Sequence, residues 1–463
     1  MRRLSSELLL FGFILPMLSA ERSNSNSSSH FVGPVDESRS VFVHLFEWTF
    51  DDIAVECEQF LGPRGYSAVQ VSPPQLSING PQWWTRYQPV SYQLFTRSGN
   101  QQQFSSMVNR CNAVGVGIYV DAVINHMAAA DRSFPDVPYG FNDFHNPQCF
   151  IDNYFDRDNV QRCDLLGLND LNTEAEYVQQ TISNYLNNLT SMGVAGFRID
   201  AAKHIAASSL QQIVNRLVGN PFVFQEVISG GGEPITPQEY VQIGDVTEFG
   251  WGDRIKSAFQ GGQLRNLQFA GNGLLASEQA VVFVDNHDTQ REGRHLTYKD
   301  GSTYNLANIF QLSYPFGYPK VMSSYGFTDV DSGPPGTGVH SGNSCSDNGG
   351  DWICEHRWDG IANMVRFANV AVDAWTVDYW WDDGNNRIAF SRGNLAFIAI
   401  NGENTPFTRT FKTGLNVGRY CEILFQSSNG APCQFPVDVN IDGDVTLTIP
   451  AMNAQAIHVG STS

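Results

Sequence analysis

Charged residues are scarce in this chain, and the positive ones are the scarcer. Only 16% of the 463 residues are charged, with 28 Lys and Arg against 47 Asp and Glu, which gives a net charge of −19. A surface of this sign repels phosphate backbones, so we expect no nucleic-acid partner. Hydrophobic residues make up 42% of the sequence, which is enough for a large buried core.

Long apolar runs are absent from the chain after residue 20. No segment there reaches the roughly 18 uncharged apolar residues that a membrane helix needs. We therefore expect no membrane span. A basic start at Arg2 and Arg3, an apolar centre and a small-residue end at Ala20 predict a secretory signal peptide over residues 1–20. The polar stretch that follows predicts a flexible lead-in over 21–40. From the signal peptide we expect a secreted, extracellular protein, and we expect it to be a monomer.

A glycine-rich phosphate-binding loop is also missing after the early strands, which argues against an open, doubly wound sheet. Short apolar runs instead alternate with helical patterns in eight units. Such alternation indicates a parallel sheet, and eight units predict a closed (β/α)8 TIM barrel in the α/β class. The predicted strands lie in residues 41–48, 65–74, 115–126, 194–201, 221–228, 244–251, 280–288 and 319–325.

Two segments interrupt this alternation. Residues 127–172, after the third strand, are rich in Asp, Asn, Pro and Phe, and an excursion of this length predicts a small inserted domain. Residues 385–463 contain short alternating runs that predict a C-terminal antiparallel β-sandwich domain. The barrel is accordingly assigned to residues 41–126 and 173–384.

Three carboxylates are expected at one end of the barrel. Asp200, Glu226 and Asp288 each follow a predicted strand, and the carboxyl ends of barrel strands build the active site in this architecture. Arg198 shares a strand face with Asp200 because side chains alternate with period two. Buried charges are costly unless they are paired or used. We therefore predict a functional site here, in which Arg198 keeps Asp200 ionised.

Four blocks, "DAVINH", "GFRIDAAKH", "FQEVI" and "FVDNHD", resemble in this order the signature blocks of the α-amylase family, glycoside hydrolase family thirteen. "VHLFEW", "WWTRYQPVSYQL", "GGEPI", "VMSSYGF" and "WICEHRW" make the chain similar to animal-type members in particular, from about Val41 to the end. The resemblance implies that Asp200 is the nucleophile and Glu226 the general acid/base. It assigns Asp288 to orienting the substrate and stabilising the transition state.

The activity that the resemblance implies is that of a secreted α-amylase. Such an enzyme cleaves internal α-1,4-glucosidic bonds in starch, glycogen and malto-oligosaccharides, and it retains the anomeric configuration. Two alternatives remain open from the sequence: a maltosidase or transglycosylase on the same fold, and a non-catalytic glucan-binding protein that resembles amylases.

The resemblance also implies sugar-binding residues and ion sites. A structural calcium ion would bind the side chains of Asn125 and Asp170 and the backbone carbonyls of Gln161 and His204, since calcium prefers oxygen ligands. A chloride activator would bind Arg198, Asn286 and Lys320, the last of these being Arg in many relatives. Tyr154 is a further candidate for a sugar subsite. The other expected sugar-binding residues are Trp83, Trp84, Tyr87, His126, Arg198, Lys203, Glu233 and His287.

Cysteines are few but even in number, and the eight present allow 105 pairings from the sequence alone. Export favours disulfide formation. The resemblance implies four pairs, namely Cys57–Cys111, Cys149–Cys163, Cys345–Cys354 and Cys421–Cys433.

Overall fold

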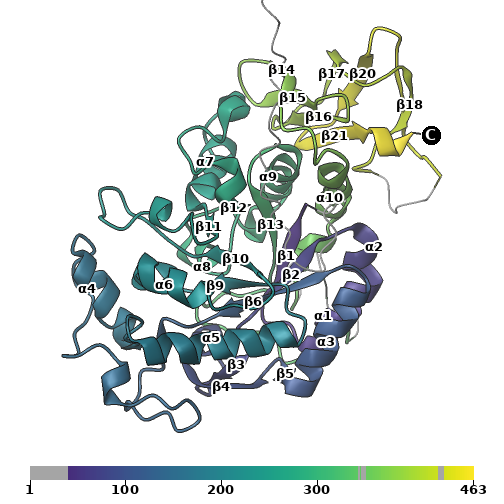
Figure 1. Cartoon of the computed structure of the whole chain (residues 1–463). Coiled ribbons are helices and arrows are strands. Elements are labelled where there is room, and N and C mark those ends of the chain that lie inside the picture. Colours follow the sequence, from purple (N-terminus) through teal and green to yellow (C-terminus); the bar gives the residue numbers. More distant parts are fainter. Residues whose placement is uncertain (1–39, 342–344, 346–350, 426–431, 463) are drawn as a thin grey trace, which may run out of the picture.

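Eight parallel strands close into a barrel in the computed structural model (Figure 1). The structure describes residues 40–462 except 342–344, 346–350 and 426–431; the predicted signal peptide and the lead-in as far as residue 39 lie outside the described residues. Each of the eight predicted runs supplies one strand, which confirms the (β/α)8 prediction. The strands are β1 (Phe42–Leu45), β2 (Ala68–Val71), β6 (Gly117–Ala122), β9 (Gly196–Ile199), β10 (Phe222–Gln225), β11 (Asp245–Thr247), β12 (Ala280–Phe283) and β13 (Tyr318–Ser323).

Helices follow the strands and cover the outside of the barrel (Figure 1). Their local signals are clear in α3, which begins with a reciprocal capping box between Asn100 and Gln103. Helix α5 buries Val178, Ile182 and Leu186, spaced four residues apart on one face. The outer helices are α1 (Phe50–Glu56), α2 (Gly62–Arg64), α3 (Gln101–Ala113), α5 (Glu176–Ser191), α6 (Ala207–Val214), α7 (Phe249–Phe259), α9 (Ser302–Ser313) and α10 (Asp359–Val370), and the short α8 (Thr289–Glu292) lies at the carboxyl end of β12.

Side chains fill the barrel interior in two layers. The lower layer, toward the amino ends of the strands, is aromatic, and the upper layer, toward their carboxyl ends, is polar. In the lower layer the ring of Phe42 lies 5.4 Å from that of Tyr119 and 4.7 Å from that of Tyr318. Gly196 makes room there, because a Cβ at this position would approach the Tyr119 ring to 2.8 Å. Two residues further along most of the strands the side chain faces inward again and is polar, whereas on β12 Val281 is followed by Phe283. The successive positions are Phe42 and His44, Ala68 and Gln70, Tyr119 and Asp121, Gly196 and Arg198, Phe224 and Glu226, and Tyr318 and Lys320.

The excursion after the third barrel strand is attached to the barrel by a short antiparallel pair. Strand β7 (His126–Met127) pairs with β8 (Asn169–Asp170), so the excursion leaves and returns at the same place. It contains the helix α4 (Arg157–Arg162). A second small sheet, which precedes α3, is formed by β3 (Gln75–Ser77), β4 (Pro89–Thr96) and β5 (Gly99–Asn100).

The C-terminal part is all β and antiparallel, as predicted, and it lies beside α9 and α10 (Figure 1). Its four-stranded sheet packs through Phe397 and Ala399 against Phe411 and Leu447 of the β17–β20 pair, so the two layers share one core. The first strand starts at Asp378, seven residues before 385. The strands are β14 (Asp378–Asp382), β15 (Arg387–Arg392), β16 (Ala396–Asn401), β17 (Phe407–Lys412), β18 (Gly418–Cys421), β19 (Pro436–Val439), β20 (Asp444–Ile449) and β21 (Asn453–His458).

Four disulfides link the chain, in the pairs that the resemblance implied. No helix among the described residues is both long enough and apolar enough to cross a membrane. The disulfides are Cys57–Cys111, Cys149–Cys163, Cys345–Cys354 and Cys421–Cys433.

A buried carboxylate ties the first helix of the barrel to the segment after its last strand. Glu56, at the end of α1, is fully buried. His356 lies 2.9 Å from one of its oxygens, His340 lies 3.2 Å from the other, and Arg357 donates to both. Together these partners hold the pKa of Glu56 well below its usual range, although burial opposes the shift.

We predict that Glu56→Gln lowers the free energy of unfolding by about 3 kcal/mol or more, because it removes the buried charge that Arg357 and the fully buried His356 share. Urea unfolding followed by tryptophan fluorescence measures the change. Glu58→Gln is the matched control, since Glu58 forms an exposed pair with Arg110 and should cost less than about 1 kcal/mol. Equal effects of the two substitutions would contradict the prediction.

Candidate active site

The polar layer of the barrel ends in a cluster of carboxylates around one cation. Asp121 on β6 and Arg198 on β9 are register partners in the sheet. Glu226 lies one residue beyond β10, and Asp200 one residue beyond β9. All four side chains belong to the buried part of the molecule. Strand parity therefore brings these charges together at the carboxyl ends of three neighbouring strands.

Arg198 holds three of these carboxylates at once. Its Nη1 donates to Asp121 Oδ1 at 2.6 Å and to Asp200 Oδ1 at 2.9 Å. Its Nη2 donates to Glu226 Oε1. The other oxygen of Glu226 accepts from the backbone N–H of Ala201 at 3.0 Å, and Ala201 has a left-handed conformation (φ 48°). Asp200 and Glu226 thus lie side by side on one guanidinium group.

The protonation of this cluster differs from the sequence-based expectation for Asp200. Burial and the neighbouring Glu226 and Asp121 carboxylates raise the pKa of Asp200 well above its ordinary value, and Arg198 only partly opposes this. The pKa of Asp121 is raised for the same reasons. The structure does not support the expectation that Arg198 keeps Asp200 ionised, because Asp200 is buried and the fold divides the cation among three acids.

Asp288 completes the group from the opposite side of the barrel. It directly precedes α8, and Asn286 fixes this turn because its Oδ1 accepts from the backbone N–H groups of Asp288 and Thr289. Burial and the Glu226 carboxylate raise the pKa of Asp288 to about 7. The side chain of Asp288 keeps 26% of its surface exposed, so the cluster is open to a substrate on this side.

Aromatic rings form a wall next to Asp288. Tyr87 stacks on His287 with the ring centroids 5.2 Å apart, and Trp83 meets His287 edge-on at 5.5 Å. The Tyr87 hydroxyl donates to Asp121 Oδ2 at 2.9 Å, which links this wall to the carboxylate cluster. Trp83, Trp84 and Tyr87 share the short helix η2 (Trp83–Tyr87), and Trp84 is half-buried there.

Arg291, on α8, supports this wall. Its guanidinium lies 4.9 Å from the centroid of the Trp83 ring and 5.2 Å from that of Phe46. It also donates to the backbone carbonyl of His287 at 2.6 Å and to that of Val330 at 3.2 Å. The Trp83 indole donates to the same Val330 carbonyl at 2.9 Å. Arg291 therefore fixes Trp83 relative to the strand end that carries Asp288.

The remaining predicted sugar-binding residues fall into two groups. Lys203 forms an ion pair with Glu233 and lies 4.8 Å from the centroid of the Tyr154 ring, so these three form one cluster beside Glu226. His126 is buried, and both of its ring nitrogens already face protein atoms, namely the carbonyl of Tyr87 and the side-chain amide of Asn125. The structure thus gives His126 a positioning contact with Tyr87.

Two of the four residues expected to bind calcium, Asn125 and Asp170, contact each other, and Gln161 contacts the sequence neighbour of His204. Asn125 donates to Asp170 Oδ1 at 3.2 Å across the β7–β8 pair. Gln161, on α4, donates to the carbonyl of Lys203, the residue before His204. Among the described residues no group of three or more His, Cys, Asp or Glu side chains is arranged to hold a metal ion. The expected set is of another kind, with one carboxylate, one amide and two carbonyl oxygens, and this donor chemistry fits calcium.

The three residues expected to bind chloride are all buried. Lys320 Nζ has one long hydrogen bond, 3.4 Å to Gln70 Oε1, and lies 4.6 Å from the centroid of the Phe283 ring. Burial, reinforced by the Arg198 cation, lowers the pKa of Lys320 to about 7. A buried ammonium so weakly paired, next to a second cation, fits an anion site.

Sequence reasoning did not assign a role to several residues that the structure brings to the site. Asp121 binds Arg198 as closely as Asp200 does. The sequence could have indicated a role for Asp121, because it lies in the same block as Asn125. His44 lies 5.5 Å from the His287 ring, and its position two residues after Phe42 on β1 places it on the inner face. No sequence pattern indicated the role of Arg291, since the residues that it contacts come from four separate segments.

The chain matches two family descriptions, "Alpha amylase, catalytic domain" over residues 80–220 and "Alpha amylase, C-terminal all-beta domain" over residues 380–460. The alpha-amylase of Tenebrio molitor is 44% identical over 467 residues, which cover 91% of this chain and 98% of the relative. An alpha-amylase-related protein of Drosophila willistoni is 45% identical over 445 residues, covering 88% and 90%.

Solved structures agree with these sequence matches. Alpha-amylase I of the earthworm Eisenia fetida, a variant of which was crystallised with maltohexaose, superposes with a TM-score of 0.85 at 39% identity, and the match covers 92% of this chain and 98% of that one. In this chain the barrel with its excursion precedes the C-terminal β domain, and the two family matches follow one another in the same order. This chain therefore belongs to the alpha-amylase family and is similar to its animal members.

Proposed function

We propose that this protein is a secreted α-amylase that hydrolyses internal α-1,4-glucosidic bonds of starch, glycogen and malto-oligosaccharides with retention of configuration. The observation that carries the proposal is the sharing of Arg198 by Asp200 and Glu226 at an open barrel rim, next to Asp288. A retaining glycosidase needs two carboxyl groups about 5–5.5 Å apart, and two carboxyl groups bound to one guanidinium are close neighbours. The four disulfides are compatible with secretion.

In the proposed reaction Asp200 attacks the anomeric carbon while Glu226 donates a proton to the departing glucosidic oxygen. The bond to the leaving sugar breaks, and a glycosyl ester forms on Asp200. Glu226 then removes a proton from a water molecule that attacks the same carbon and releases Asp200. Asp288 and the Tyr87–His287 wall hold the sugar ring at the point of cleavage.

The carboxylate cluster supplies the proton that this reaction needs. Raised pKa values at Asp121, Asp200 and Asp288 mean that the cluster retains protons where isolated carboxyl groups would be ionised. Attack requires an ionised Asp200, so we propose that substrate binding leaves a proton on Glu226 and the negative charge on Asp200. Arg198 contacts both groups and can stabilise either distribution.

We also propose a structural calcium ion bound by Asn125, Asp170 and the carbonyls of Gln161 and His204. When bound, this ion would neutralise the buried Asp170 carboxylate and join the excursion to the segment that follows Asp200. A chloride ion bound by Arg198, Asn286 and Lys320 would offset the repulsion between the two buried cations.

Two other functions are compatible with this fold: maltosidase or transglycosylase activity, and glucan binding without catalysis. Curated relatives include alpha-amylase-related proteins of several Drosophila species. The presence of Asp200, Glu226 and Asp288 together favours a catalytic protein.

We predict that Glu226→Gln lowers the hydrolysis rate by a factor of about 100 to 10,000, because it removes the general acid. The measurement is starch–iodine staining beside the release of reducing sugar. Early loss of staining by the parent indicates internal cleavage, whereas early release of reducing sugar indicates a maltosidase. Glu233→Gln is the control, since it keeps the acid and should change the rate by less than about tenfold. Persistent staining with the parent protein would contradict the proposal.

We predict that calcium raises the melting temperature of the parent and that Asp170→Asn abolishes this response. At 100 times its dissociation constant a ligand of the folded state adds about 2.7 kcal/mol of stability. Differential scanning calorimetry after chelation, and again after calcium or magnesium is restored, measures the effect. An equal response of parent and variant to calcium would show that Asp170 is not a ligand.

We predict that chloride binding weakens as the pH rises through about 7, because the Lys320 ammonium with its lowered pKa then loses its proton. Activity titrated with sodium chloride at several pH values, against sodium gluconate, measures the apparent affinity. Lys320→Arg should remove this pH dependence, since Arg stays charged, and Lys320→Gln should remove the response to chloride. A parent rate that is the same with and without chloride would contradict the site.

A further inference from the structure

Glu47 is a buried carboxylate that the proposed reaction does not use. It lies two residues beyond β1, at the carboxyl end of the barrel strands, and its side chain is fully enclosed. Its backbone is in the left-handed region (φ 66°), which is uncommon for a residue other than glycine. Glycine would take this conformation without strain. We therefore expect the side chain of Glu47 to make a contribution that outweighs the strain.

The backbone of Glu47 is held by the end of the neighbouring strand. Its N–H donates to Ser72 Oγ at 2.9 Å, and Ser72 directly follows β2, which pairs with β1 in the barrel. Both residues are buried. The barrel itself thus fixes the place from which the carboxylate of Glu47 extends.

Two arginines meet at this carboxylate. Arg86, which is fully buried, donates from Nη1 to Glu47 Oε2 at 3.2 Å, and Arg97 Nε lies 3.6 Å from the same oxygen. Among the residues that the structure describes, no other carboxylate pairs with either arginine. A buried cation is costly when it has no counter-charge, and the cost is greater beside a second cation. Glu47 supplies the counter-charge for both.

The two arginines fix the short helix η2, which carries the rings of the aromatic wall. Arg86 belongs to η2 and donates from Nε and Nη2 to the carbonyl of Pro73, at 3.0 and 2.5 Å. Arg97, which directly follows β4, donates at 2.9 Å to the carbonyl of Gln82, the residue that caps the start of η2. Arg97 also donates to Thr85 Oγ1 within the helix. The position of η2 therefore depends on where the two guanidinium groups are held.

These contacts connect the buried carboxylate to the aromatic wall beside Asp288. Arg86 directly precedes Tyr87, whose ring stacks on that of His287. Trp83 lies in the same helix and meets His287 edge-on. A shift of η2 would move both of its rings relative to Asp288. Displacements of about 1 Å can matter greatly where a substrate is bound.

We propose that Glu47 is a positioning residue for substrate binding, which acts through Arg86 and Arg97 to hold the aromatic wall in place. The inference rests on the proposed function, since it takes the wall to be a sugar-binding surface. The wall contacts the sugar chain before the reaction as well as during it. An interaction of this kind contributes to binding more than to the chemical step. A neutral side chain at position 47 would leave Arg86 without its counter-charge and let η2 shift.

The test compares Glu47→Gln with Glu56→Gln as the matched control. Glu56 is also buried and also pairs with an arginine, but that arginine, Arg357, belongs to the segment after β13. Calorimetric titration with maltoheptaose measures affinity in the Glu226→Gln background, so that the sugar is not digested. The KM and kcat for maltoheptaose are measured with Glu226 intact. Circular dichroism identifies a temperature at which every variant is folded.

We expect Glu47→Gln to bind maltoheptaose about fivefold or more weakly and to raise KM by a similar factor, while kcat changes by less than about twofold. Glu56→Gln should leave the affinity and KM unchanged, although it destabilises the fold. Unchanged affinity of Glu47→Gln would overturn the proposal. An equal loss of affinity in both variants would overturn it too, because lost stability would then explain the effect. A loss confined to kcat would do the same.

Arg97→Gln tests the same link if Glu47→Gln does not fold. The side chain of Arg97 is 25% exposed, so its replacement should cost less stability than a change at a fully buried charge. We expect this variant to bind maltoheptaose about threefold or more weakly, because η2 then loses its contacts at Gln82 and Thr85. Binding equal to that of the parent would count against the role of Glu47.

The result also separates this inference from the proposed function. If the protein binds maltoheptaose but the parent does not hydrolyse it, the proposed function fails, and weaker binding by Glu47→Gln still supports the positioning role. If the parent hydrolyses maltoheptaose and Glu47→Gln binds it as the parent does, the function stands and the positioning role fails.

Discussion

The sharing of Arg198 among Asp121, Asp200 and Glu226 is the constraint on which the rest of the site depends. Three acids within hydrogen-bond reach of one buried cation cannot all be ionised at low cost. Burial and the excess negative charge together raise the pKa values of Asp121, Asp200 and Asp288 and so keep protons at the site. The same arrangement places a nucleophile and an acid next to each other, so the electrostatic strain and the proposed chemistry have one origin.

The barrel provides this arrangement through strand parity. Next to the charged layer lies a packed aromatic layer, and most of the strands pass from an apolar or glycine position to a polar one in two residues. The aromatic layer excludes water from the base of the cluster, which makes the charges above it interact strongly. The wall of Tyr87, His287 and Trp83, fixed by Arg291, then defines the side from which a sugar chain approaches.

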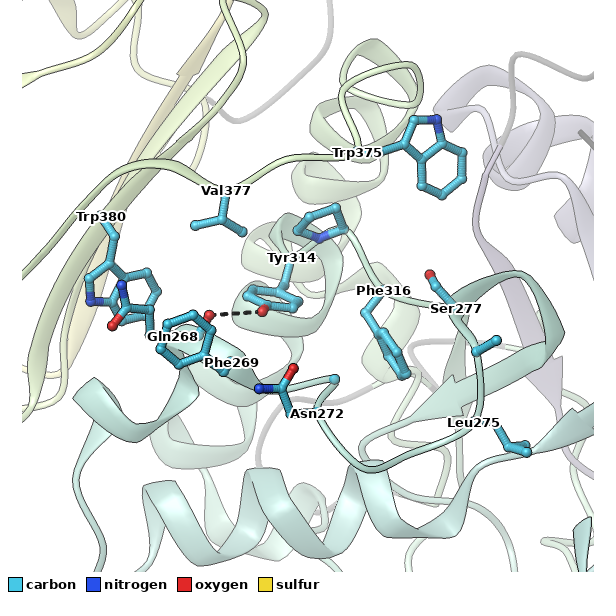
Figure 2. Close-up of a pocket in the computed structure, with 13 residues that line it drawn as sticks. Gln268, Phe269, Asn272, Leu275, Ser277, Tyr314, Phe316, Trp375, Val377 and Trp380 are labelled. Atoms are coloured by element: carbon cyan, nitrogen blue, oxygen red, sulfur yellow. Dashed lines mark hydrogen bonds between the residues drawn. The ribbon is translucent and has the colours of Figure 1, made fainter. Parts of the chain in front are cut away.

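Much of this could be predicted from the sequence, because the relevant signals are local. The eight strands follow from short apolar runs, and Asp200, Glu226 and Asp288 follow from their positions at strand ends. Other features depend on contacts that no local pattern encodes. The sequence showed Arg198 beside Asp200 but not that Asp121 and Glu226 divide the same cation. The sequence also gave no sign that Arg291 fixes Trp83. Nor did it indicate the cavity between η7 (Leu264–Phe269) and β14 (Figure 2), because the residues that line this cavity are far apart in the chain.

The most direct test of the central claim is to trap the covalent intermediate. In the Glu226→Gln variant a malto-oligosaccharyl fluoride can still transfer its sugar, since fluoride leaves without a proton, but hydrolysis of the ester lacks its base. Peptide mapping by mass spectrometry then locates the sugar. The account predicts one glycosyl group, attached to Asp200. A label on another residue, or no label together with a product of inverted configuration, would contradict it.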